Sequence, residues 1–193
     1  MKPKKHVVYY DGTSNKRAEY YTLNDKLHRE DRPAHIFYYE NGNISSEYYY
    51  INDKHYREDG PASIWYYKNG NIQYEYYYIN GEWHRENGPA RIYYDGTRNK
   101  HVERYELNGK YHREDGPASI CYYKNGNIEC EYYYINGEWH REDGPAIIYY
   151  YENGNIGSEE YYINGKELTK EQFIRKRDSK IFYKLLEEMV EEK

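Results

Sequence analysis

A period of 28 residues constrains the fold of this chain more than any other feature, because the text Pro-Ala-x-Ile returns at that interval without an insertion. Repeats of this length are expected to form one small supersecondary unit each, which gains stability by stacking on its neighbours. An earlier unit without the opening Pro-Ala is recognised from Glu19, Tyr21 and Asn24, so the chain holds six repeats. The repeated prolines are Pro33, Pro61, Pro89, Pro117 and Pro145.

Each repeat carries the signals of a β-hairpin. In the third repeat, Asn69-Gly70 separates two runs of tyrosine and β-branched residues, and Asn-Gly favours a two-residue type I′ turn. A second pair at Asn80-Gly81 predicts another turn before the Gly-Pro that opens the next repeat. The register set by the first turn pairs Ile64 with Glu75, Trp65 with Tyr74 and Tyr66 with Gln73.

Alternation along the strands predicts two different faces. The recurring face carries the residues found in every repeat, such as Ile64, Tyr66, Glu75, Tyr77 and Ile79, and we expect it to be buried between repeats. The varying face changes from repeat to repeat but is rich in rings, which are enriched at protein interfaces. An alternative is that these rings only pack on one another across strands. The candidate binding residues are Phe37, Tyr48, Trp65, Tyr76, Trp83, Tyr93, Tyr132, Trp139 and Tyr149.

The tail differs from the repeats and predicts a helix. Thr169 and Gln172 form a candidate capping box, and Arg175 to Asp178 interrupt the apolar pattern, so we expect one kinked helix or two helices. The apolar stripe is expected to cover the last repeat, as a cap does in other arrays. The stripe consists of Phe173, Ile174, Ile181, Phe182, Leu185, Leu186, Met189 and Val190.

These signals together predict an all-β repeat array, an elongated antiparallel sheet of tandem β-hairpins with a C-terminal α-helical cap. The expected domains are the six repeats in residues 1–168 and the capping helix in residues 169–193.

Composition and charge exclude several classes of function. The net charge of −5 provides no basic field for phosphate backbones, so no nucleic acid partner is expected. No stretch approaches the roughly 20 apolar residues of a membrane span, and the acidic balance weakens a peripheral membrane role. The first residues lack the apolar core of a secretory signal, which favours a cytoplasmic location, the host cytoplasm if the protein is viral.

Neither catalysis nor a metal site is indicated. Recurring Arg-Glu pairs, such as Arg57-Glu58, are better explained as links to a glutamate or carbonyl of the adjacent unit than as several identical active sites. One histidine per repeat spreads ligands too far for a tetrahedral metal site, which favours structural imidazoles. Cys121 and Cys130 face each other in the predicted register, and a cytoplasmic setting favours two reduced thiols over a disulfide. We therefore expect a non-enzyme without a cofactor. The recurring histidines are His28, His84, His112 and His140.

The pattern xYYxNGxIxxExYYxNGxxH resembles the MORN repeat, and specifically its shorter variant form, over about residues 5–168. The segment HREDGPA lengthens each unit beyond that family's pattern. The resemblance implies a single-layer, twisted antiparallel sheet that serves as a scaffold, and some MORN proteins are linked to phosphoinositide membranes. The variant repeat is also similar to that of bacterial antitoxin-like proteins and of proteins of large DNA viruses.

Three hypotheses for function follow from these features. The first is a non-catalytic scaffold that binds a protein partner, or itself, through the aromatic face. The second is an antitoxin or viral counter-defence protein that sequesters a toxin or a small ligand. The third is a peripheral binder of phospholipid headgroups.

Overall fold

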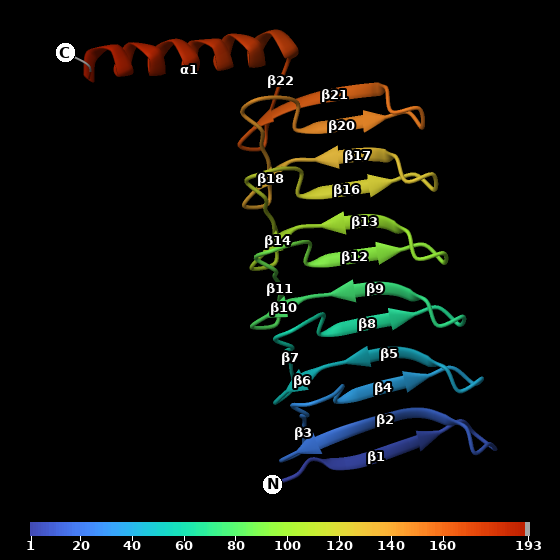
Figure 1. The fold of residues 1–193 in the computed structure, drawn as a ribbon. Coiled ribbons are helices and arrows are strands. Elements are labelled where there is room, and N and C mark those ends of the chain that lie inside the picture. Colours follow the sequence, from blue (N-terminus) through green and yellow to red (C-terminus); the bar gives the residue numbers. More distant parts are fainter. Residues whose placement is uncertain (192–193) are drawn as a thin grey trace. The chain divides into compact units, whose positions relative to one another are not determined.

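The computed structural model describes the backbone of residues 1–191 and the side chains of residues 1–183. Two compact units divide the chain, Met1–Lys110 and Tyr111–Lys193, and each is described by itself. Both are built from antiparallel β-hairpins, and the second ends in a helix (Figure 1). The predicted class of tandem antiparallel hairpins with a C-terminal helix is confirmed.

The main sheet of the first unit has the strand order β1-β2-β4-β5-β8-β9-β12-β13, so hairpins that follow one another in the sequence are neighbours in the sheet. Its strands are β1 (Lys4–Tyr9), β2 (Lys16–Leu23), β4 (His35–Tyr38), β5 (Ile44–Tyr48), β8 (Ser63–Tyr66), β9 (Ile72–Tyr76), β12 (Arg91–Tyr94) and β13 (Lys100–Arg104). Short strands follow each large hairpin: β3 (Lys26–Leu27), β6 (Tyr50–Ile51), β7 (Lys54–His55), β10 (Tyr78–Ile79), β11 (Glu82–Trp83) and β14 (Glu106–Leu107), with β15 (Lys110–Tyr111) at the unit boundary.

The second unit repeats this plan with the strand order β16-β17-β20-β21-β22. Its elements are β16 (Ser119–Tyr122), β17 (Ile128–Tyr132), β18 (Tyr134–Ile135), β19 (Glu138–Trp139), β20 (Ile147–Tyr150), β21 (Ile156–Ile163), β22 (Lys166–Leu168) and the helix α1 (Lys170–Glu191).

The two Asn-Gly pairs of a repeat form different turns. The second pair adopts the type I′ geometry, with φ of +55° at Asn80 and +87° at Gly81. At the first pair only Gly70 has a positive φ, and its N–H donates to the Tyr67 carbonyl at 2.9 Å. This is a three-residue loop with a glycine bulge, not the predicted two-residue turn.

The longer loop shifts the register near the turn but not beyond it. Tyr66 pairs with Ile72, so the predicted pairing of Tyr66 with Gln73 is wrong. The register shifts between Trp65 and Tyr66, where Gln73 of β9 is the extra residue of a bulge, and this restores the predicted pairs Trp65 with Tyr74 and Ile64 with Glu75. The predicted division of side chains between the two faces therefore holds for the main strands.

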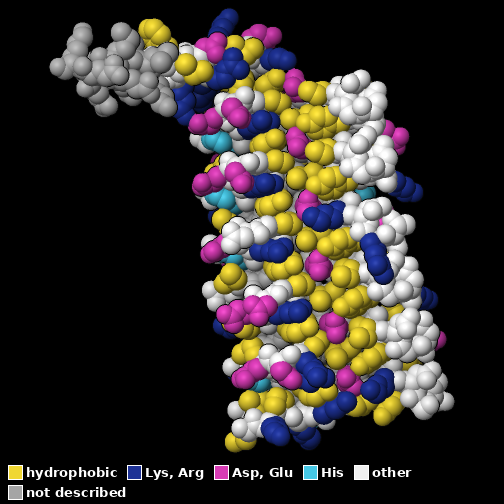
Figure 2. All heavy atoms as spheres, in the orientation of Figure 1, with side chains coloured by type: hydrophobic (Ala, Val, Ile, Leu, Met, Phe, Trp, Pro, Cys, Tyr) yellow, Lys and Arg dark blue, Asp and Glu magenta, His cyan; other side chains and the backbone are white. Residues whose placement is uncertain are grey.

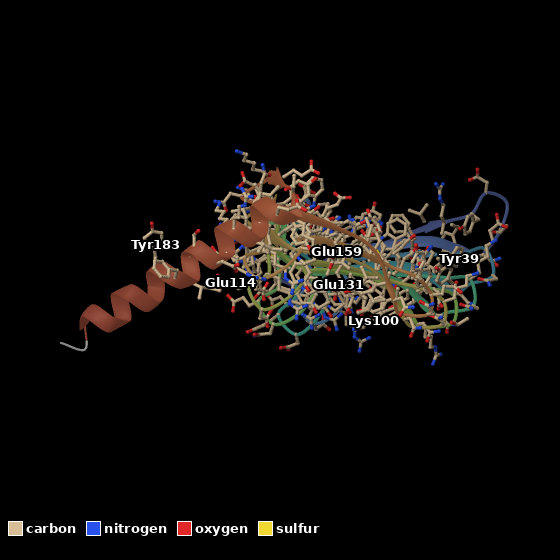
Figure 3. All side chains as sticks on the ribbon, turned by 90° about the horizontal axis from the view of Figure 1, so that it is seen from above. Tyr39, Lys100, Glu114, Glu131, Glu159 and Tyr183 are labelled. Carbon is tan, nitrogen blue, oxygen red and sulfur yellow. A yellow bond between two sulfur atoms is a disulfide. The ribbon has the colours of Figure 1, made fainter. Side chains whose placement is uncertain are left out.

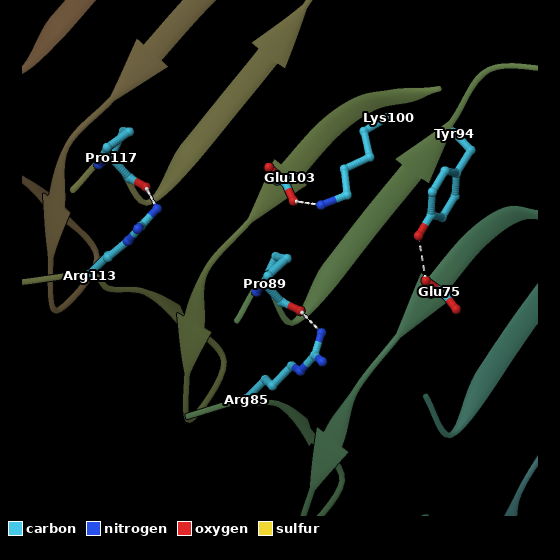
Figure 4. A network of polar contacts seen from close by, with 8 residues as sticks. All are labelled: Glu75, Arg85, Pro89, Tyr94, Lys100, Glu103, Arg113 and Pro117. Carbon is cyan, nitrogen blue, oxygen red and sulfur yellow. Dashed lines mark hydrogen bonds and ion pairs between the residues drawn. The ribbon is translucent and has the colours of Figure 1, made fainter. Parts of the chain in front are cut away.

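The recurring face contains the core of each unit. Its alanines and the isoleucines two positions on are buried in every repeat that has them. Between repeats, the Tyr66 hydroxyl donates to the Glu47 carboxylate at 2.6 Å, and Tyr94 donates in the same way to Glu75 (Figure 4). Figure 2 shows a hydrophobic band that is interrupted by single acidic side chains. Ile79 is an exception, because it is 45% exposed where the sequence predicted burial.

The recurring arginines and histidines link each repeat to the next. The Arg85 guanidinium lies 3.8 Å from the Tyr77 ring centroid and donates to the Pro89 carbonyl at 3.3 Å, and Arg113 donates similarly to Pro117 (Figure 4). Nδ1 of His84 lies 3.0 Å from Oδ1 of Asn108 in the following repeat. The interpretation of these side chains as structural, made from their repetition, is confirmed by these contacts.

Helix α1 is continuous and begins with the predicted capping box. The Thr169 N–H donates to the Gln172 side chain at 2.9 Å, and the Gln172 N–H donates to the Thr169 hydroxyl at 3.2 Å. The predicted interruption at Arg175–Asp178 is absent, because these residues include no proline or glycine and their charged side chains can remain in solvent.

The helix covers less of the last repeat than its apolar pattern predicted. Phe173 is buried against Tyr161, with ring centroids 4.9 Å apart. Ile181, Phe182 and Tyr183 are exposed, and Figure 3 shows Tyr183 on the part of α1 that extends away from the strands of its unit. The predicted stripe thus packs only near its start. Leu185, Leu186, Met189 and Val190 lie outside the described side chains.

Candidate binding surface

The varying face of the first unit is organised in two rows that run across the strands. Cross-strand pairing places residues of successive strands side by side within each row. We call them the Trp65 row and the Tyr76 row. The Trp65 row is Val8, Ala18, Phe37, Ser46, Trp65, Tyr74, Tyr93 and Val102; the Tyr76 row is His6, Tyr20, His35, Tyr48, Ser63, Tyr76, Arg91 and Arg104.

The predicted aromatic residues of this unit alternate between the two rows and touch one another. Phe37 contacts Tyr48 with ring centroids 6.0 Å apart, and Tyr48 contacts Trp65 at 6.1 Å. Both pairs are edge-to-face, the arrangement that aromatic quadrupoles favour. Farther along, Tyr76 and Tyr93 lie 5.9 Å apart. Five of the nine predicted residues therefore belong to one aromatic surface.

Small residues leave the central rings of this surface accessible. The buried Ser46 lies beside Trp65 in its row, and the buried Ser63 lies between Tyr48 and Tyr76 in the other. Trp65 is 40% exposed although it lies in the middle of the sheet. An indole that remains this open at the centre of a ring cluster is the type of residue that anchors protein interfaces.

In the central part of this surface, before Arg91 and Arg104, the hydrogen-bonding groups are neutral. Burial raises the pKa of the Tyr48 and Tyr76 hydroxyls, so both remain protonated donors at neutral pH. Burial lowers the pKa of His35, which favours its neutral imidazole. The surface can therefore accept and donate hydrogen bonds without presenting a full charge in its central part.

Trp83 lies in a second set of rings, formed by the short hairpins. His55 stacks on Tyr78 with centroids 4.5 Å apart, and Tyr78 contacts Trp83 at 6.4 Å. His55 also contacts Tyr48 at 6.0 Å, which joins this set to the Tyr76 row. The Arg91 guanidinium lies 4.0 Å from the Trp83 ring centroid, so one side of this indole is covered.

In the second unit the aromatic surface is smaller. Tyr132 and Tyr149 lie edge-to-face at 5.9 Å, and their hydroxyls are 3.0 Å apart. Trp139 lies with the short hairpins, 4.9 Å from the Tyr162 ring. The second unit therefore brings Tyr132 and Tyr149 together and leaves Trp139 in a separate group.

Cys121 and Cys130 face each other on this surface and form a disulfide, with Cα atoms 5.0 Å apart. The register that pairs them was predicted, but the expectation of two reduced thiols is wrong. That expectation rested on the assumed compartment, whereas the pairing of directly opposite positions brings the Cα atoms within bonding reach.

Sequence reasoning missed several members of the surface. Tyr20 precedes Tyr48 by one period and stacks on His6 at 4.6 Å, and Tyr74 contacts Trp65 at 6.4 Å. The period predicts Tyr20 from Tyr48, and the predicted pairing places Tyr74 opposite Trp65, so both signals were present in the sequence. The ion pair of Arg91 with Glu106 was also missed, although both residues depart from the serine and tyrosine of neighbouring repeats.

Open grooves lie beside the short hairpins, between the Arg-Glu loops of consecutive repeats. A groove of about 420 Å³ in the first unit is lined by Glu58, Asp59, His84 and Arg85, and one of about 590 Å³ in the second by Glu114, Asp115, His140 and Arg141. Among the described residues, no group of three or more histidine, cysteine or acidic side chains is arranged to hold a metal ion.

Comparison with protein families gives one match, the MORN repeat variant, at residues 34–52, 62–80 and 118–136. Each matched stretch begins at the alanine after the repeated proline and ends at the asparagine of the type I′ turn. The resemblance of these repeats to MORN repeat variants is therefore confirmed. No curated protein and no solved structure matched the chain.

No helix in the described part of the chain is long and apolar enough to cross a membrane.

Proposed function

We propose that this chain is a non-catalytic repeat scaffold that binds a protein partner through the varying face, centred on Trp65. The observation that carries this proposal is the exposure of Trp65 in the middle of a continuous set of ring contacts. Aromatic anchors in central positions supply much of the binding energy of protein interfaces.

The contrast between the two faces supports the proposal. Residues of the recurring face are occupied by contacts between repeats, such as the bond from Tyr66 to Glu47. Trp65 contacts rings of its own face and remains partly open. A partner can cover this indole without breaking the links that hold the repeats together.

Replacing the exposed indole tests the proposal. Trp65→Ala should reduce capture of a partner from the source cells by about tenfold or more, because it removes the central anchor. Tyr56→Ala is the matched control, since Tyr56 is also exposed but lies in the loop after a short hairpin. Capture that falls equally in both variants, or in neither, would contradict the role of the varying face.

A further inference from the structure

We propose that the partner segment bound by the Trp65 and Tyr76 rows is proline-rich and adopts the polyproline II conformation. This inference rests on the proposed function, because it names the class of partner for the same surface. It is carried by the spacing of the rings, the neutrality of the central part of the face and the hydrogen-bond donors that the rings carry.

The spacing of equivalent rings matches the pitch of a polyproline II helix. Phe37, Trp65 and Tyr93 occupy the same position in β4, β8 and β12, and one strand separates each from the next. Neighbouring strands are about 4.8 Å apart, so these rings recur about every 9.6 Å. A polyproline II helix advances about 3.1 Å per residue and repeats every three residues, or about 9.3 Å. Every third residue of such a segment can therefore meet an equivalent ring.

The alternation of large and small residues produces a relief suited to a ridged ligand. Along the Trp65 row the rings of Phe37 and Trp65 flank the buried Ser46. Tyr48 stands in the other row and meets both rings at about a right angle, with interplanar angles of 84° and 80°. Pyrrolidine rings can pack against the faces of these aromatic side chains, as they do in other domains that recognise polyproline II segments.

The lack of charge in the central part of the face also favours a neutral partner segment. The central part of the face contains His35, Phe37, Ser46, Tyr48, Ser63, Trp65, Tyr74 and Tyr76. None is an acid or a strong base, in a chain of which 32% of the residues are charged. The arginines of the Tyr76 row begin beyond Tyr76: Arg91 is paired with Glu106, and the Arg104 guanidinium lies 5.0 Å from the Tyr93 ring centroid. Over Phe37 and Trp65, a charged segment would lose hydration without gaining a counter-ion. A neutral segment of prolines and small residues does not incur this loss.

The donors of the face match the acceptors of a polyproline II backbone. Proline has no N–H, and this conformation makes no internal hydrogen bonds, so its carbonyls need external donors. The Trp65 indole N–H and the Tyr48 hydroxyl are donors on this face, whereas the Tyr76 hydroxyl interacts with Tyr93. An extended strand would instead present N–H groups as well as carbonyls, and the Trp65 indole N–H can only donate.

Titration with defined peptides tests the inference. A capped polyproline peptide of about nine residues spans the three equivalent rings and should bind the full-length chain saturably in calorimetry. Trp65→Ala should weaken binding by about tenfold, whereas Tyr56→Ala should leave it unchanged. One glycine inserted at the centre of the peptide should also weaken binding, because it shifts the three-residue period that engages Phe37 and Trp65 together.

Three outcomes would overturn the inference. Polyproline does not bind saturably, or its binding is insensitive to Trp65→Ala. The third is that the face binds cellohexaose, a neutral chain of sugar rings, in place of polyproline. These failures are distinguishable from failure of the proposed function. If polyproline does not bind while Trp65→Ala still abolishes capture of the natural partner, only the class of partner segment is wrong. If Trp65→Ala leaves capture intact, both proposals fail.

Discussion

The ion pair between Arg91 and Glu106 allows a stability prediction in which neighbouring repeats supply the control. Arg91 donates from Nε to the Glu106 carboxylate at 2.7 Å and also from its terminal nitrogen. The equivalent residues are serine and tyrosine, as in Ser63 and Tyr78. We predict that Arg91→Ser destabilises the protein and that adding Glu106→Tyr restores stability.

The magnitude follows from the burial of the pair. The side chains of Arg91 and Glu106 are 10% and 2% exposed, so the small energies of surface ion pairs do not apply. Removing one partner of a buried pair typically costs about 3–5 kcal/mol, because the other charge stays buried and loses its counter-ion. Replacing both partners with residues that fit is often neutral or stabilising.

Urea unfolding followed by tryptophan fluorescence provides the assay, because Arg91 lies against the Trp83 ring. Urea unfolding should show the loss of about 3–5 kcal/mol directly. In a thermal melt the same loss corresponds to a fall in melting temperature of roughly 6–20 °C for a chain of this size. Lys180→Ala serves as the control, since its ion pair with Glu142 is exposed and should contribute at most about 1 kcal/mol. A double variant as unstable as Arg91→Ser alone would refute the reasoning.

Three further predictions concern burial and pH. Ile64→Ala should lower the free energy of unfolding by about 2–5 kcal/mol in a thermal melt, because Ile64 is buried. Ile79→Ala at the exposed position should lower it by less than about 1 kcal/mol. Equal losses would contradict the burial of these two residues. Burial and the Glu47 carboxylate raise the pKa of Tyr66, so stability should fall as pH rises above the ordinary tyrosine value of about 10, and Tyr66→Phe should make this fall less steep in alkaline urea melts. Burial lowers the pKa of His55, so its contribution to stability is lost as pH falls below the ordinary histidine value of about 6.5; His55→Phe should reduce the loss between neutral and acidic melts, and an unchanged slope would contradict this.

The period and the pairing rules were sufficient to predict much of the fold. The interval between repeated prolines defined the repeat, and the alternation of side chains placed Trp65 opposite Tyr74 and Cys121 opposite Cys130. The local turn was harder, because Asn-Gly is compatible with both a two-residue and a three-residue loop. At Asn69-Gly70 the bulge compensated for the extra loop residue, so the register beyond Trp65 was right although the turn type was wrong.

The remaining differences depend on contacts that a single repeat does not reveal. The position of Ile79 holds isoleucine or leucine in every repeat, yet Ile79 lies in a short strand at the type I′ turn and is exposed. The apolar spacing of α1 predicted a covering face, but only Phe173 among its described apolar side chains is buried. Periodicity identifies which residues share a face, whereas burial depends on what the rest of the chain places against that face.

The repeats also separate what the fold requires from what it permits. Positions of the recurring face hold neighbouring repeats together, and the same residues return there because each repeat must fit the next, as Tyr66 fits Glu47 and Tyr94 fits Glu75. Substitutions on the varying face are accommodated within a strand pair, as in the Cys121–Cys130 disulfide. The positions equivalent to Trp65 hold Phe37, Tyr93, Cys121 and Tyr149, so this position accepts different residues even though Trp65 contacts Tyr48 of the preceding repeat. The partner segment that we propose would cover this exposed indole without replacing a contact of the recurring face.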